Sequence, residues 1–150
     1  MSAERLIASH LRLSAESLSA ADVLLRAGNR NAAYQAEQAV EQLILALAQA
    51  ESTPFTRSQQ HQLETMRRAL PEADAFRADL AELTWLESFA TTYRYPRPAG
   101  GISDPPSVDR LQSAIGSMER LLRRVAAHFG VDLDLRSESP ASQIEPPRGR

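Results

Sequence analysis

The chain has 150 residues, of which 43% are hydrophobic and 24% charged, and its formal net charge is −2. This composition favours one domain with a packed core, and the charge excludes an overall attraction to nucleic acid or anionic lipid. The sequence contains neither cysteine nor lysine, which excludes disulfides, thiolate chemistry, lysine Schiff bases and Walker-type phosphate loops.

The N-terminus and the apolar runs of the sequence indicate where in the cell the protein resides. The longest apolar run, LILALA at residues 43–48, is far shorter than a membrane span. The opening MSAERLIASH has an acid and a polar helix start, and lacks the basic and apolar regions of a secretory signal. We therefore expect a cytoplasmic protein without membrane contact.

Two long helices are predicted at the start of the chain, over residues 3–27 and 31–50, separated by a turn at Gly28. Small and apolar residues recur at three- and four-residue steps on one face of the first helix: Ile7, Leu11, Ser14, Leu18, Ala21 and Leu25. The second helix has its apolar face at Ala36, Val40, Leu43, Ile44 and Leu47.

Three further helices are predicted after a loop at residues 51–60. A short helix spans 60–69, and a longer one spans 74–92. A loop rich in proline and glycine at 93–106 leads to the fifth helix, which starts near Asp104–Ser107 and runs to Gly130. The inward residues of the 74–92 helix are Phe76, Leu80, Leu83, Leu86 and Ala90. Those of the last helix follow a heptad: Leu111, Ile115, Met118, Leu122, Val125 and Phe129.

No stretch alternates at period two for long enough to form a strand. The predicted fold is all-α, an up-and-down bundle of four long helices plus one short helix. The bundle occupies residues 1–130. Residues 131–150 contain three prolines and few large apolar groups, and are predicted to be a disordered tail.

Acid–base and metal-binding residues are few. The histidines are His10, His61 and His128, and no two have the spacing of helical metal ligands. Two carboxylate pairs, Glu37 with Glu41 and Asp79 with Glu82, fit a solvated helix face. We predict no metal and no cofactor. His10 and His128 are interpreted as packing residues, and His61 as a residue that organises the preceding loop through a hydrogen bond.

The second helix, NAAYQAEQAVEQLILALAQ at residues 31–49, resembles a helix of HEPN-domain proteins, in which Gln-Ala-x-Glu follows a small and aromatic start. HQLETM at 61–66 is similar to the family's His-x-Leu start of a short helix. YRYP at 93–96 is similar to the turn of the subgroup typified by Arg-Tyr-Pro. With the long first helix and its glycine turn, the resemblance covers residues 8–128. The matching residues in the second helix are Tyr34, Gln38, Ala39 and Glu41.

The resemblance implies a helical bundle that forms a homodimer and that often pairs with a minimal nucleotidyltransferase. Some members of the family are ribonuclease toxins of toxin–antitoxin pairs. In these toxins an Arg, a spacer of four to six residues and a His from each of two copies form one RNA-cleaving site. The His acts as acid–base group, and the Arg stabilises charge on the phosphate.

This chain departs from the toxin pattern, because no His follows Arg94 before His128. The toxin spacing does occur at Arg5–His10 and Arg123–His128, but a chain so rich in arginine produces about as many matches by chance. Five residues along a regular helix turn by about 500°, which leaves Arg123 and His128 about 140° apart. A single regular helix therefore does not point both side chains at one phosphate, although a dimer could reassemble the pair.

We call residues 93–97 the YRYPR corner, with Tyr93, Arg94, Tyr95 and Arg97 as candidate ligand- or partner-binding residues together with His61. Two interpretations of the corner stay open. Pro96 ends a helix whose tyrosines cap the core, or the arginines bind an anion through forked donors and stacking. The length of the loop favours function, because long structureless loops are uncommon in compact domains.

The leading prediction is a non-catalytic HEPN-like module that homodimerises or binds a nucleotidyltransferase-like partner, with nucleotide or RNA at the YRYPR corner. The alternative is a metal-independent ribonuclease toxin that uses Arg94 or Arg123 with His128 across a dimer. A purely structural helical adaptor is the third possibility. Whether the protein is an enzyme stays open at this point, with the missing Arg-spacer-His pair arguing against it.

Overall fold

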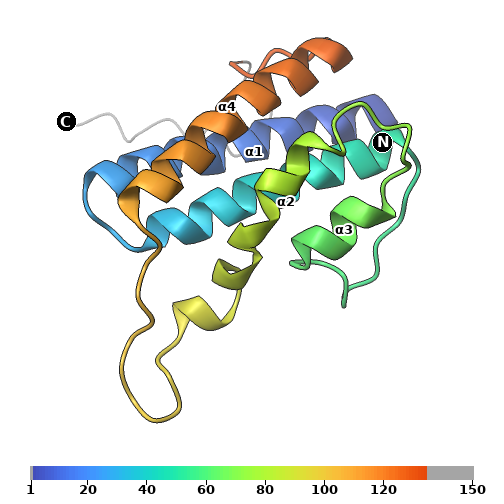
Figure 1. Ribbon diagram of the computed structural model, residues 1–150. Coiled ribbons are helices and arrows are strands. Elements are labelled where there is room, and N and C mark those ends of the chain that lie inside the picture. Colours follow the sequence, from blue (N-terminus) through green and yellow to red (C-terminus); the bar gives the residue numbers. More distant parts are fainter. Residues whose placement is uncertain (1, 135–150) are drawn as a thin grey trace, which may run out of the picture.

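The structure is a computed structural model that describes residues 2–134, and all its regular elements are helical, with no strand in that range. The predicted all-α fold is thus confirmed. Three long helices, α1 (Ala3–Arg26), α2 (Asn31–Ala50) and α4 (Val108–Phe129), pack side by side, and the short α3 (Leu63–Ala69) lies beyond α2 (Figure 1). None of the described helices is long and apolar enough to cross a membrane.

Local signals in the sequence set the helix ends. The side chains of Ser2 and Ser107 accept hydrogen bonds from the backbone N–H groups of the third residues of α1 and α4, as N-caps do. Gly28 follows α1 with φ 66°, and Gly130 ends α4 with φ 65°. Glycine adopts this left-handed conformation without the steric cost of a Cβ.

The core forms where the predicted faces meet. Five of the six residues of the α1 face are buried, and so are five of the six heptad residues of α4. Helix α2 lies at the centre and contacts α1, α3, α4 and the segment before the loop at 95–107. Its burial therefore extends beyond the predicted apolar face and includes Glu37 and Glu41. The interpretation of this carboxylate pair as a solvated helix face is wrong.

The predicted fourth helix at residues 74–92 does not form one regular α-helix. It is built from three short 3₁₀ segments: η1 (Asp79–Glu82), η2 (Thr84–Phe89) and η3 (Thr92–Arg94). Leu80, Leu83 and Leu86 are all buried, as predicted. Their three-residue spacing matches the three residues per turn of a 3₁₀-helix, so that all three side chains point to one side.

After η3 the chain forms a long loop that projects away from the three long helices before α4 begins (Figure 1). At the other end of α4, Val131 and Leu133 pack against the core, and the backbone of Asp132 accepts a hydrogen bond from Arg12. The first residues of the predicted tail thus belong to the folded unit. The remainder of that tail, 135–150, lies outside the described residues.

Candidate functional site

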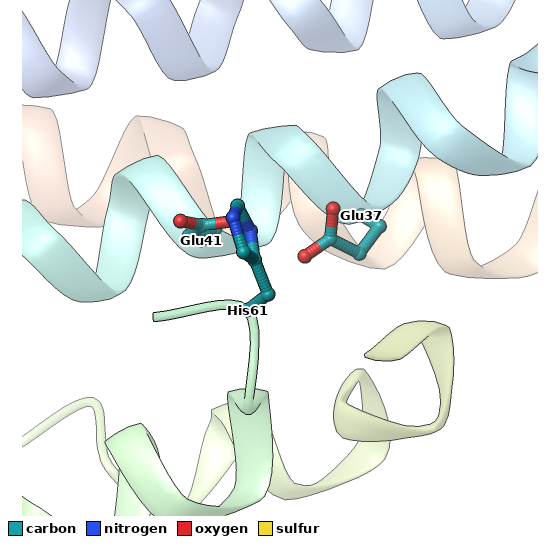
Figure 2. Close-up of side chains that lie close together, drawn as sticks. All are labelled: Glu37, Glu41 and His61. Carbon is teal, nitrogen blue, oxygen red and sulfur yellow. The ribbon is translucent and has the colours of Figure 1, made fainter. Parts of the chain in front are cut away.

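An acid–histidine cluster lies on the side of α2 that faces α3. It consists of Glu37, Glu41 and His61, which each offer one ligand atom within 4.8 Å of the others. Figure 2 shows the two carboxylates on successive turns of α2, with His61 approaching from the segment that precedes α3. His61 Nδ1 lies 2.8 Å from Glu41 Oε2, at hydrogen-bonding distance. The hydrogen bond of His61 therefore joins the end of the loop before α3 to α2.

Gln38 lies between the two acids in sequence and links them. Its side-chain amide donates to Glu37 Oε2 at 2.8 Å and approaches Glu41 Oε2 at 3.4 Å. Both carboxylates are thus oriented by a donor on the same helix. The resemblance to the Gln-Ala-x-Glu pattern had singled out Gln38 and Glu41, and the structure joins them in one cluster.

Glu37 is fully buried, with 0% of its surface exposed, and its Oε1 atom has no hydrogen-bond partner among the described residues. Burial raises the pKa of Glu37 to about 8, against the hydrogen bond from Gln38, and the nearby carboxylates of Glu41 and Glu87 raise it further. Without a counter-charge this side chain is therefore protonated at neutral pH. An orphaned buried carboxylate oxygen is uncommon, because burial of an unpaired polar atom costs free energy.

His61 adopts an unusual backbone conformation, with φ 73°. A positive φ is uncommon for residues other than glycine, although histidine tolerates it better than most. The conformation turns the chain into α3 and brings the imidazole to Glu41, with 47% of the side chain exposed. The cluster is therefore closed on its α2 side and open to solvent at the imidazole.

The YRYPR corner divides into a buried and an exposed part. Tyr93 is 3% exposed and its hydroxyl donates to the backbone carbonyl of Arg30 at 2.8 Å. The Arg30 guanidinium lies 3.9 Å from the centre of the Tyr93 ring and donates to the carbonyls of Tyr93 and Ser103. Arg30 thus fastens both ends of the projecting loop to the start of α2. The contacts of Tyr93 are internal, and no pattern in the sequence singled out Arg30.

Arg94 belongs to the exposed part of the corner. Its guanidinium lies 4.6 Å from the ring centre of Tyr34 on α2 and 5.6 Å from that of Tyr95. Tyr95 is 61% exposed, and Arg97 is exposed in the turn that Gly100 and Gly101 close. Within residues 2–134, neither Arg94 nor Arg97 forms an ion pair with a carboxylate. The structure therefore brings Arg94 together with Tyr34, a pair far apart in the sequence.

The acid–histidine cluster and the YRYPR corner share one side of α2. Tyr34, Gln38 and Glu41 follow each other at four and three residues, and so lie on the same helical face. Seven residues of α-helix span about 10 Å. The arginine stacked on Tyr34 and the histidine beside Glu41 therefore mark the two ends of a single short face.

The residues of the ribonuclease alternative lie elsewhere. His128 is near the C-terminus of α4, in edge-to-face contact with Phe76 and Phe129. The loop that follows Arg94 leads instead to the start of α4. The start of α4 is about 30 Å from His128 along the helix axis. Arg123 is exposed on α4. Within one chain the structure does not bring His128 to Arg94.

His10 makes a structural contact. Its Nδ1 atom lies 2.8 Å from Gln42 Oε1, at the packed boundary between α1 and α2. The exposed Asp79 pairs with Arg124 at 3.0 Å, as expected of a carboxylate on a solvated surface.

The comparisons with known proteins bear on this geometry. A family model described as HEPN domain matches residues 7–128, which include α2, most of α1 and α4, the acid–histidine cluster and the YRYPR corner. Neither the curated proteins nor the solved structures include one that matches the chain.

Proposed function

The chain belongs to the HEPN domain family, and from this premise we propose that it is a non-catalytic module that dimerises and binds a nucleotidyltransferase-like partner. The YRYPR corner is its contact point, and a phosphate of a nucleotide or of RNA binds there. The observation that carries the proposal is Arg94, an exposed guanidinium held against two tyrosine rings with no carboxylate partner within residues 2–134.

The chemistry of the corner suits a phosphate next to a planar base. A guanidinium offers forked N–H donors that match phosphate oxygens, and its stacking on Tyr34 fixes the direction of the fork. The exposed ring of Tyr95 offers a face on which a base can stack. Arg97 supplies a second cation a few residues away.

The projecting loop supports a role in partner binding. Three large exposed apolar residues belong to this loop or its ends: Tyr95 at its start, Ile102 within it and Val108 at the start of α4. Exposed apolar side chains gathered in one region mark contact surfaces more often than isolated ones do. Arg30 holds both ends of the loop, so the partner meets a fixed surface.

The missing pair of the toxins supports a non-catalytic role. No His follows Arg94 at the toxin spacing, and within the chain His128 contacts Phe76 and Phe129 rather than an arginine near the corner. A ribonuclease site built from Arg94 and His128 would need a dimer that brings the YRYPR corner of one copy to the C-terminal end of α4 of the other.

The test measures binding of fluorescently labelled ATP and of a labelled single-stranded RNA oligonucleotide by anisotropy, with light scattering for the oligomeric state. We expect Arg94→Ala to weaken binding at least tenfold and Arg94→Lys to restore it in part. The exposed loop residue Arg57 provides the matched control, since Arg57→Ala removes an arginine elsewhere. Equal binding by wild type and Arg94→Ala would remove the corner from the proposal.

Expression in cells distinguishes a partner-binding module from a ribonuclease. A gene for a nucleotidyltransferase next to this one should yield a protein that co-purifies with wild type and is lost with Arg94→Ala. Expression without a partner should leave growth and total RNA intact. Growth arrest with RNA cleavage, abolished by His128→Ala, would establish the ribonuclease alternative in place of the proposal.

A further inference from the structure

We propose that the acid–histidine cluster binds one divalent transition-metal ion, through carboxylate oxygens of Glu37 and Glu41 and the imidazole of His61. The inference is independent of the function proposed for the YRYPR corner. It differs from the prediction made from sequence, where Glu37 and Glu41 fit a solvated face and His61 was 20 residues away from the nearer of them.

The first support is convergence. Three ligand atoms from two separate segments lie within 4.8 Å of one another. Metal–ligand bonds of about 2.1 Å place neighbouring ligand atoms about 3 Å apart and opposite ones about 4.2 Å apart. The separation of 2.8 Å between His61 Nδ1 and Glu41 Oε2 is already close to that of neighbouring ligands. Small side-chain rotations would thus complete the arrangement.

The second support is the orphaned oxygen of Glu37. Oε1 is buried and has no partner among the described residues, although Oε2 of the same carboxylate accepts a hydrogen bond from Gln38. The carboxylate is placed beside Glu41 and His61 (Figure 2). A cation bound there gives this oxygen the partner that residues 2–134 do not supply, and its charge offsets that of the two acids.

The third support is the way the site is held. Gln38 donates to oxygens of both acids, as outer residues do when they fix the orientation of metal ligands. His61 holds its imidazole at Glu41 by means of a left-handed backbone conformation. An unusual conformation maintained at a cluster of chemical groups is a reason to test that cluster for function.

The donor set indicates the class of metal. Two carboxylates and one imidazole suit Zn²⁺ and Mn²⁺, whereas Mg²⁺ prefers oxygen ligands and retains water. For a mixed site of this kind the usual order of affinity places Zn²⁺ above Mn²⁺. The exposed side of His61 leaves room for water to complete the coordination.

The experiment is calorimetric titration of the full chain, freed of metal by EDTA and dialysis, with ZnCl₂, MnCl₂ and MgCl₂ in turn. We expect one Zn²⁺ per chain, weaker binding of Mn²⁺, and no binding of Mg²⁺ at the same concentrations. Glu37→Gln should weaken Zn²⁺ binding at least tenfold. Gln keeps the size of the side chain, and circular dichroism checks that the variant is folded.

His61→Gly is the second variant, since glycine accepts the positive φ at this position and lacks the imidazole. It should also weaken Zn²⁺ binding at least tenfold. Glu119→Gln removes an exposed acid on α4 and serves as the control that should bind as wild type does. Absence of Zn²⁺ and Mn²⁺ binding by wild type, or equal binding by folded Glu37→Gln, would overturn the proposal.

Discussion

The two ends of the α2 face hold charge in opposite ways. At the acid–histidine cluster, Glu37 is buried with no ion pair among residues 2–134, and burial raises the pKa of its carboxyl group to about 8. At the YRYPR corner, Arg94 stays in solvent and rests on aromatic rings. Burial causes this difference. A cation would stabilise the buried acids of the cluster, whereas an anion from solvent would stabilise the exposed guanidinium of the corner.

The largest effect is expected from truncating a buried side chain of η2. Leu86 is a buried residue of η2, which packs on α2. Leu86→Ala should lower the free energy of unfolding by about 3 kcal/mol, because it leaves a cavity in the core. Urea denaturation measures the loss. An exposed leucine, Leu13, supplies the control, and Leu13→Ala should change stability by far less. Equal losses in the two variants would contradict the packing of η2.

Glu37→Gln tests the buried acid without metal. Since the pKa of Glu37 is raised from 4.5 to about 8, the folded protein retains a proton that the unfolded chain releases between these values. The free energy of unfolding of the wild type should therefore fall as pH rises from about 4.5 to about 8. The variant has no proton to release at this position, so its stability should not show this fall. In EDTA at pH 7 the variant should be more stable by on the order of 2 kcal/mol. Thermal unfolding across pH would show the gap, and a gap independent of pH would contradict it.

Arg30→Ala tests the anchor of the YRYPR corner. The change removes hydrogen bonds to the carbonyls of Tyr93 and Ser103 and the stacking on the Tyr93 ring. We expect a loss between about 1 and 2 kcal/mol, together with faster amide exchange in the projecting loop. Arg57→Ala should leave both unchanged. A stable variant with an unchanged exchange pattern would show that the loop is held by other contacts.

The smallest effect is expected at an ordinary ion pair. Hydrogen bonds from Arg67 lower the pKa of Glu64 to about 2, with a further bond from Arg68. This group contributes stability above its ordinary pKa of 4.5, and the contribution is lost as pH falls from there to about 2. Glu64→Gln should therefore cost less than about 1 kcal/mol at pH 7 and nothing near pH 2. Urea unfolding curves of wild type and variant at the two pH values would measure the difference in free energy of unfolding.

Much of the fold was predictable from the sequence. The seam from Ile7 to Leu25 and the heptad of α4 identified buried faces, since apolar periodicity reports directly which side of a helix leaves water. Residues 74–92 were harder. The inward leucines were correctly placed, but their three-residue spacing belongs to 3₁₀ turns, which the 3.6-residue pattern of an α-helix approximates over a short stretch.

The candidate sites were predicted only in part. Arg94 was selected from its own neighbours in the sequence, but its stacking on Tyr34 joins residues 60 apart. The acid–histidine cluster was missed, because acids four residues apart on a helix usually face solvent. Nothing in the local sequence showed that the segment after Pro71 would cover that face of α2.

The sequence by itself determined the three long helices, their ends, the apolar faces and the resemblance that the family match supports. These features depend on local propensity and periodicity, which neighbouring residues encode. Only the tertiary structure decided that Glu37 is buried, that His61 meets Glu41 and that Arg30 holds the projecting loop. Burial and long-range contacts arise when separate elements pack together, and packing is what buried this pair of acids and placed a histidine beside it.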